Sequence, residues 1–279
     1  MLKKLTSINA IFVGIVVQTL FFSTVAHAKH LDIHTKAQGV LNVISYSKFT
    51  PISYDGGKGY EGDLLRAVAS LWGLKIKFYP ESIYEGLWLL PSKDYTIADI
   101  AMGGMTPSVY RMKQGALFST ETIPFNQSLL VRKMDYISRR IVSYQSFKDS
   151  HLKIGVVPGT TGERYAHLRA KENHLSRNVF VTYESESELL PALMSGKIDA
   201  IARGDIGNKY QESKNKTLIT IAQKSFGEHF AFAINNANPG LKNNLDHAIK
   251  QITNNGQITY VQWLKNHNIF MERVQLLHS

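Results

Sequence analysis

The sequence predicts an α/β fold arranged as two lobes. Short apolar runs of β type alternate along the chain with amphipathic helical patterns, which is typical of sheets covered by helices. The same alternation occurs twice, in the first half of the chain and again from Leu152. Apolar runs at 128–131 and 230–234 flank the second occurrence. We expect these runs to be the two hinge strands that join a discontinuous first lobe to a continuous second lobe.

The first half contains one clear helix between short strands. The helix is expected at 63–72, since apolar residues at helical spacing share one face and Gly73 follows as a stop. The strands are expected at 40–45, 75–79 and 99–102. We expect the last of them to end at a turn formed by Gly103 and Gly104.

The second half repeats this order with two helices, and the tail of the chain adds two more. A turn at 159–162 follows its first strand. The expected strands are 152–157, 179–183 and 198–202, and the expected helices are 163–171, 186–195, 241–252 and 258–266. The lobes are therefore expected to comprise 37–126 with 235–279, and 127–234.

The amino terminus has the features of a cleaved signal peptide. Lys3 and Lys4 precede an apolar stretch from Ile8 to Phe22, and an Ala-x-Ala site ends at Ala28. A membrane anchor is less favoured, because the stretch is shorter than about 20 residues and polar residues interrupt it. We therefore expect residues 1–28 to be removed and the protein to be periplasmic.

Cysteine and charge content narrow the class of protein further. The chain has no cysteine, so it carries neither disulfides nor the lipidated cysteine of an anchored lipoprotein. Removal of residues 1–28 leaves 251 residues with a formal charge of +8. The charges are scattered and form no tract typical of nucleic-acid binding. We expect a monomer without a cofactor.

Two motif matches do not predict sites. Gly57-x-Gly59-x-x-Gly62 has dinucleotide-binding spacing, but a turn-rich loop separates it from the preceding strand. His30 and His34 are four residues apart, yet they follow directly after the expected cleavage site. We expect a plain loop at the first and no metal site at the second.

The segment from Asp99 to Arg111 is the most informative. Two glycines at the carboxyl end of a strand leave backbone groups bare where α/β proteins bind ligands. Thr106 is expected at a helix start, and the planar guanidinium of Arg111 suits a carboxylate. The alternative is a helix cap followed by a surface arginine.

This segment resembles the signature of the polar-amino-acid family of bacterial extracellular solute-binding proteins. Four further blocks agree with the family in the same order along the chain. They are Gly59–Leu64, Gly159–Thr161, Gly196–Ala200, and Asn255-Gly256 followed by Trp263-Leu264.

The resemblance implies a two-lobed type II periplasmic-binding fold that holds its ligand between the lobes. It implies that Arg111 binds the α-carboxylate of an amino acid, assisted by Thr106 and Thr161, with the Gly104 backbone facing the α-ammonium. Phe49 is implied to pack over the ligand. Tyr46 and Tyr84 are candidate wall residues, and Tyr46 has an equally simple role in the core.

The chain departs from the family pattern at three places. Pro107 and Ser108 replace an apolar residue and a threonine, and Gly162 replaces a larger polar residue. The family's ammonium-binding aspartate falls on Gly204, with Asp205 one position later. Either Asp205 points inward and binds the ammonium, or the amino group is held differently. Asp205 could also be a helix cap.

The implied function is the periplasmic binding component of an ABC importer, which binds an amino acid or a similar zwitterion and docks on an inner-membrane permease. The main alternative is a dehydratase of the same fold acting on a prephenate-like acid, with Glu163 or Asp205 as general acid. A receptor sensor module is less favoured, because no membrane segment follows in the sequence.

Overall fold

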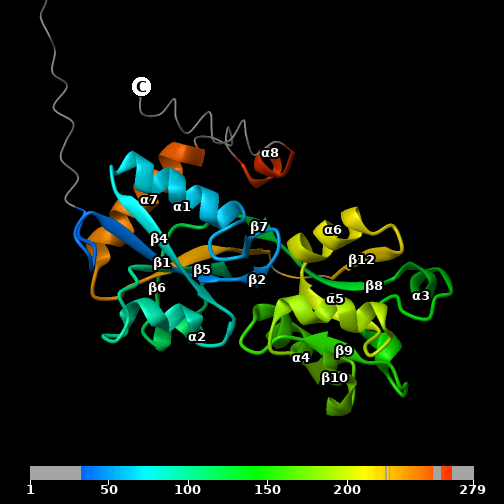
Figure 1. The fold of residues 1–279 in the computed structure, drawn as a ribbon. Helices are drawn as coiled ribbons and strands as arrows, with labels where there is room; N and C mark the ends of the chain where they lie inside the picture. Colours follow the sequence, from blue (N-terminus) through cyan, green and yellow to red (C-terminus); the bar gives the residue numbers. More distant parts are fainter. Residues whose placement is uncertain (1–32, 224, 226, 254–258, 266–279) are drawn as a thin grey trace, which may run out of the picture. The chain divides into compact units, whose positions relative to one another are not determined.

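Two five-stranded sheets organise the chain in the computed structural model (Figure 1). The structure describes residues 33–223, 225, 227–253 and 259–265, so the expected signal peptide lies outside the described residues. We call each sheet with its helices a lobe. Within the described ranges, no helix is long and apolar enough to cross a membrane.

The first sheet holds a parallel core with an antiparallel return strand. Its strands, in spatial order, are β4 (Lys75–Glu81), β1 (Val40–Tyr46), β5 (Ile100–Met105), β14 (Ala231–Ile234) and β6 (Leu117–Phe118). β1 is parallel to β4 and β5, whereas β14 is antiparallel to β5 and β6. Because β5 is buried on both faces, it is apolar apart from its two glycines.

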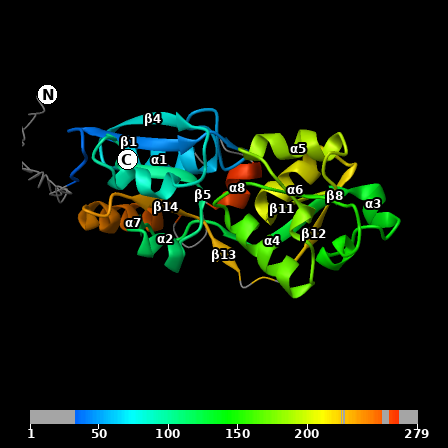
Figure 2. The same ribbon diagram turned by 90° about the horizontal axis from the view of Figure 1, so that it is seen from below.

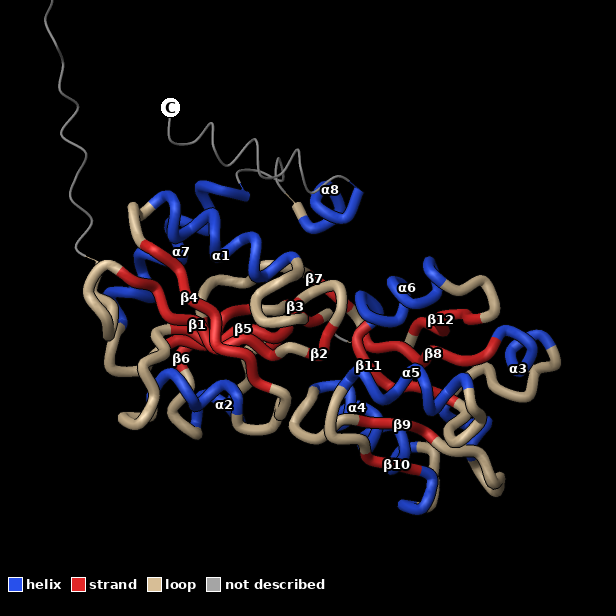
Figure 3. Tube along the Cα trace, viewed as in Figure 1, coloured by secondary structure: helices blue, strands red, loops and turns tan. Residues whose placement is uncertain are grey.

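Helices cover the first sheet and complete its core. α1 (Tyr60–Leu71) and α7 (Pro239–Thr253) pack against each other along this sheet, and α2 (Val109–Lys113) follows β5 (Figures 1 and 3). Their buried faces carry leucine, valine and isoleucine at helical spacing. α8 (Tyr260–Lys265) contacts α1, and the Trp263 indole N–H donates to Asp63 at 2.8 Å.

The second sheet is built in the same way. Its strands, in spatial order, are β10 (Phe180–Thr182), β9 (Ile154–Val156), β11 (Ala200–Gly204), β8 (Gln127–Arg132) and β12 (Leu218–Ala222). β9, β10 and β11 are parallel, and β8 is antiparallel to its neighbours. The helices that pack against this sheet are α4 (Thr161–Glu172), α5 (Glu186–Met194) and α6 (Asp205–Lys214), and α3 (Lys133–Ile137) follows β8.

The crossings between the sheets differ from the expected ones. The runs at 128–131 and 230–234 lie within β8 of the second sheet and largely within β14 of the first. The crossings are instead β7 (Pro124–Phe125) and β13 (Glu228–His229), which pair with each other in antiparallel fashion. Figure 2 shows β13 between the two sheets. The expectation was wrong because apolar content marks buried strands, whereas these crossings are only two residues long.

Smaller elements complete the chain. β2 (Lys48–Phe49) and β3 (Ser53–Tyr54) form a hairpin after β1, and 3₁₀ helices cover Leu87–Ser92, Tyr144–Phe147 and Arg177–Val179. Gly57 to Gly59 form a turn-rich loop that leads into α1, and Gly62 lies in the first turn of that helix. β5 is longer than expected, since it continues through Gly103 and Gly104 to Met105. The strand continues because Ala231 of β14 pairs with Met105.

Candidate functional site

The end of β5 brings backbone groups to the face between the lobes. Gly104 has a φ of 65°, and a Cβ there would lie 2.6 Å from the Phe49 ring, so only glycine fits. The amide N–H groups of Gly103 and Gly104 both donate to the Glu61 carboxylate, at 2.8 and 3.0 Å. The Gly104 carbonyl accepts a hydrogen bond from the Tyr84 hydroxyl at 3.1 Å.

Glu61 is a buried acid directly behind this strand end. Burial raises the pKa of its carboxyl from 4.5 to about 8, and the two glycine amides only partly oppose this effect. Its second oxygen has no hydrogen-bond partner among the residues that the structure describes. The carboxyl is therefore mostly protonated at neutral pH.

Arg111 joins the two lobes. Its side chain is 2% exposed, and it donates to the carbonyls of Thr106 in the first lobe and Gly159 in the second, both at 2.8 Å. It also donates to the Tyr84 hydroxyl at 3.4 Å and lies 4.4 Å from the centre of the Trp88 ring. It is thus not the surface arginine of the alternative interpretation.

The start of α2 differs from the expected one. The residue that caps it is Ser108, whose hydroxyl accepts from the Arg111 amide at 3.2 Å, so Thr106 does not begin the helix. Proline at 107 explains the shift, because the residue before a proline avoids helical backbone angles.

The second lobe contributes the turn before α4. The hydroxyls of Thr106 and Thr161 are 3.5 Å apart across the lobes, and the Gln127 side chain donates to Thr161 at 3.3 Å. A Cβ on Gly162 would lie 2.9 Å from the Ala202 carbonyl oxygen and 2.9 Å from the Arg203 Cα. The close packing of α4 on β11 explains why this position is glycine.

Aromatic rings form the walls. Phe49 contacts Phe230 edge-on with ring centres 5.9 Å apart, and Phe125 lies 4.4 Å from Phe230. The hydroxyl of Tyr46 accepts from the Glu186 amide of the second lobe at 3.0 Å. Tyr46 is fully buried, so it belongs to the core and also connects the lobes.

The structure does not bring Asp205 together with these residues. Asp205 is the first residue of α6. Its carboxylate accepts hydrogen bonds from the Asn126 amide at 3.1 Å and from the Lys209 side chain at 2.6 Å. The preceding residue, Gly204, lines the cleft instead. Asp205 is also not the cap of α6, because Gly204 occupies that position.

The cleft contains a buried ion pair that the sequence analysis did not predict. Arg203 donates to the Glu186 carboxylate at 2.8 Å, and both side chains are less than a tenth exposed. Arg203 also donates to the Asn208 side chain at 2.7 Å and to the Gly207 carbonyl at 3.2 Å. The feature that could have revealed it is an arginine near the end of an otherwise apolar strand. Burying a charge there is energetically unfavourable unless an opposite charge pairs with it.

The cavity left between these groups is small. It measures about 30 Å³ and is lined by both lobes. One water needs about 10–15 Å³ on this measure, so the cavity has room for about two waters. A ligand of amino-acid size therefore enters only when the lobes move apart.

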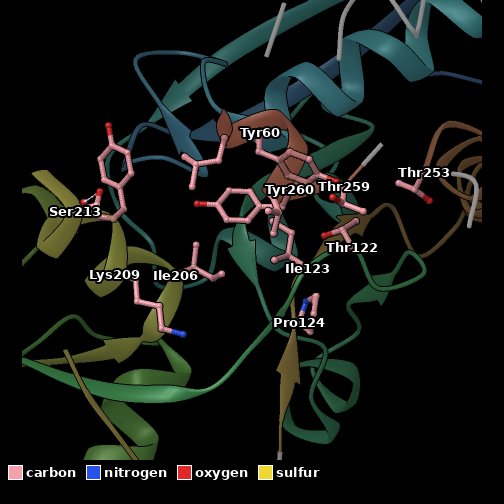
Figure 4. A pocket seen from close by; sticks show the side chains of 13 residues that line it. Tyr60, Thr122, Ile123, Pro124, Ile206, Lys209, Ser213, Thr253, Thr259 and Tyr260 are labelled. Atoms are coloured by element: carbon pink, nitrogen blue, oxygen red, sulfur yellow. Dashed lines mark hydrogen bonds between the residues drawn. The ribbon is translucent and has the colours of Figure 1, made fainter. Parts of the chain in front are cut away.

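A larger cavity of about 650 Å³ lies elsewhere (Figure 4). It is lined by α6, α8, the first residue of α1, the last residue of α7 and residues 122–124, and it shares no lining residue with the cleft. Its lining is mainly aromatic and aliphatic, with Lys209 as its charged group. In the described part of the chain, no three histidine, cysteine or acidic residues gather as metal ligands.

Comparisons with known proteins agree with this architecture. The model of the bacterial extracellular solute-binding proteins, family 3, matches residues 41–266. An ancestral arginine-binding protein bound to arginine is 24% identical with a TM-score of 0.68, covering 82% of this chain and 98% of that one. No curated protein sequence matches the chain. The expected two-lobed α/β fold is confirmed.

Two further similar structures are a precursor of an enzyme and a substrate-binding protein of a transporter. The ancestral amino-acid-binding protein AncCDT-1, a precursor of cyclohexadienyl dehydratase, is 27% identical with a TM-score of 0.67, covering 81% of this chain and 94% of that one. An amino acid ABC transporter substrate-binding protein from Streptococcus pneumoniae, bound to L-arginine, is 19% identical with a TM-score of 0.68, covering 85% and 94%.

Proposed function

The chain belongs to the bacterial extracellular solute-binding proteins, family 3, and on this basis we propose that it is the ligand-capturing component of an ABC importer. Its ligand is a solute of amino-acid size that carries a carboxylate. The protein acts in the periplasm and delivers the ligand to an inner-membrane permease. The position of Arg111, buried where the lobes meet, carries this proposal.

Arg111 is suited to a carboxylate by its geometry. Its guanidinium is held on one side by the Thr106 carbonyl and by the Trp88 ring, so its orientation is fixed. The guanidinium also donates to the Gly159 carbonyl of the second lobe, and a carboxylate that enters between the lobes would break this bond. A ligand carboxylate replaces that carbonyl with a stronger, charge-assisted partner.

Capture follows from closure of the lobes. Arg111, Tyr46 and the hydroxyls of Thr106 and Thr161 make bonds between the lobes in this structure. β7 and β13 are the short connections about which the lobes turn. A ligand that contacts both lobes favours the closed state by the difference in its affinity for the two states.

The described site supports binding over catalysis. Glu163 accepts from the Gly159 amide at 2.9 Å, and Asp205 is engaged with Asn126 and Lys209. Glu186, the carboxylate among the described residues that line the cavity, is paired with Arg203. Neither candidate general acid is therefore directed at the cavity, although a precursor of a dehydratase is among the similar proteins.

Thermal unfolding against a panel of solutes tests this proposal. We expect a higher unfolding temperature with some carboxylate-bearing solutes and with none of their amide counterparts. A ligand at about 100 times its dissociation constant stabilises the folded state by about 2.7 kcal/mol. Prephenate is included, and its conversion to phenylpyruvate with loss of carbon dioxide and water, followed as a rise in ultraviolet absorbance, would identify the enzyme instead. A panel of amino acids, oxo acids and hydroxy acids without any shift would contradict the proposal.

A further inference from the structure

An amino acid bound at Arg111 would bring its ammonium group into the same cleft. A buried ammonium needs acceptors, and at least one of them is normally a carboxylate. The resemblance to the family assigned this role to the Gly104 backbone and left Asp205 open as the acid. The structure shows what each of these groups contacts.

Neither expected acceptor offers an ammonium a carboxylate at the cavity. The Asp205 carboxylate is occupied by Asn126 and Lys209, and the residue at the cavity in its place is Gly204. The Gly104 carbonyl accepts from the Tyr84 hydroxyl and is neutral, so it does not balance the charge of an ammonium. Another nearby acid, Glu228 on the crossing strand, accepts from the Gln127 side chain at 2.6 Å and does not line the cavity.

The carboxylate that lines the cavity has a cation of its own. Glu186 pairs with Arg203 at 2.8 Å, and Arg203 is further fixed by Asn208 and Gly207. An ammonium could bind Glu186 only by sharing it with the buried Arg203 guanidinium, since the two side chains already form an ion pair. Two cations on one buried carboxylate repel each other in a region of low dielectric constant.

The charges that line the cavity balance each other, and Arg111 beside them adds one positive charge. Arg203 and Glu186 line the cavity as an ion pair, whereas Arg111 lies outside this lining and binds the Gly159 carbonyl next to it. Glu61 behind the strand end adds little negative charge at neutral pH, because burial raises its pKa to about 8. A ligand with one carboxylate and no ammonium balances this charge, whereas a zwitterion leaves the excess in place.

We propose that the cleft binds a small monocarboxylic acid that lacks an amino group and carries an apolar, preferably aromatic, side group. Phe49, Phe125 and Phe230 supply the walls for that side group. 2-Oxo acids and 2-hydroxy acids have this chemistry, and their C2 oxygen accepts from donors such as the Thr161 hydroxyl. This inference rests on the proposed function, because it narrows the solute that the importer takes up.

Calorimetric titration of matched ligands tests the inference on the unaltered protein. The probes are phenylalanine, phenylpyruvate and phenyllactate, with leucine and its 2-oxo and 2-hydroxy acids as an aliphatic set. We expect the oxo or hydroxy acid of at least one set to bind at least tenfold more tightly than its amino acid. Tighter binding of the amino acid overturns the inference but leaves the proposed function standing. If no carboxylate of the solute panel binds, both fail.

The variant Arg203→Gln provides a second test, because it is expected to gain affinity for the amino acid. The substitution frees the Glu186 carboxylate for an ammonium, so we expect the preference to shift at least tenfold toward the amino acid. Arg132→Gln is the matched control, since Arg132 makes a similar ion pair with Asp199 at 2.6 Å outside the cleft. An unchanged preference in folded Arg203→Gln protein overturns the inference.

Glu186→Gln serves if Arg203→Gln does not fold. It removes the only carboxylate among the described lining residues and leaves Arg203 in place. We expect the oxo or hydroxy acid to bind at least as tightly as before. A loss of more than tenfold in its affinity would show that Glu186 contacts the ligand and would overturn the inference.

Discussion

Replacement of Arg111 by alanine is expected to abolish ligand binding while the protein remains folded. Loss of one partner of a buried, hydrogen-bonded charge pair costs about 2–5 kcal/mol, or roughly 30-fold to several thousand-fold in affinity. Titration calorimetry with the ligand found in the solute panel measures the loss. Arg111 also bonds the carbonyls of Thr106 and Gly159, so its removal lowers stability as well.

Arg111→Lys is the control that separates charge from geometry. Lysine keeps the positive charge but cannot bind a carboxylate through two parallel N–H groups. We expect it to retain part of the affinity and to bind more weakly than the wild type. Circular dichroism of both variants reports whether they are folded. Wild-type affinity in folded Arg111→Ala protein would rule out this residue as the carboxylate-binding group.

Protein stability is expected to fall between about pH 4.5 and pH 8 because of Glu61. Below this range the carboxyl is protonated in both states, whereas within it the unfolded chain ionises and the folded protein keeps the proton. The free energy of unfolding therefore falls as pH rises, and it levels off above the folded-state pKa. A pKa that rises from 4.5 to about 8 corresponds to a loss of up to about 5 kcal/mol.

Urea unfolding at pH 5 and pH 8 measures this loss, and Glu61→Gln is the matched variant. The glutamine oxygen can accept from both glycine amides, but the side chain cannot ionise. We expect the wild type to lose more stability than the variant over this pH range. Parallel profiles for the two proteins would show that Glu61 is already ionised in the folded state.

Much of the fold could be predicted because burial leaves a clear pattern. The apolar faces of α1 and α7 and the buried strands β1 and β9 follow directly from residue spacing. The crossings could not be located in this way, since β7 and β13 are short and are defined by their pairing with each other. Pairing between segments a hundred residues apart leaves no local pattern.

The candidate site was predictable where one residue acts alone. Arg111 was singled out by its residue type, its place after the β5 glycines and the resemblance of this segment to the family, and the structure places it between the lobes. The partners of charged groups were not predictable. The spacing could not show that Asp205 pairs with Lys209, or that Arg203 and Glu186 meet from β11 and α5. These pairings depend on the side-chain directions that tertiary packing sets.

The distance between the lobes with and without ligand tests the central claim most directly. The chain has no cysteine, so Glu85→Cys and Arg164→Cys would introduce its only thiols for spin labels. Both positions are exposed, and they lie near the Glu85–Gly159 contact between the lobes. We expect saturating ligand to shorten and narrow the distribution of label distances. Ligand binding measured by calorimetry without any change in this distribution would contradict capture by closure.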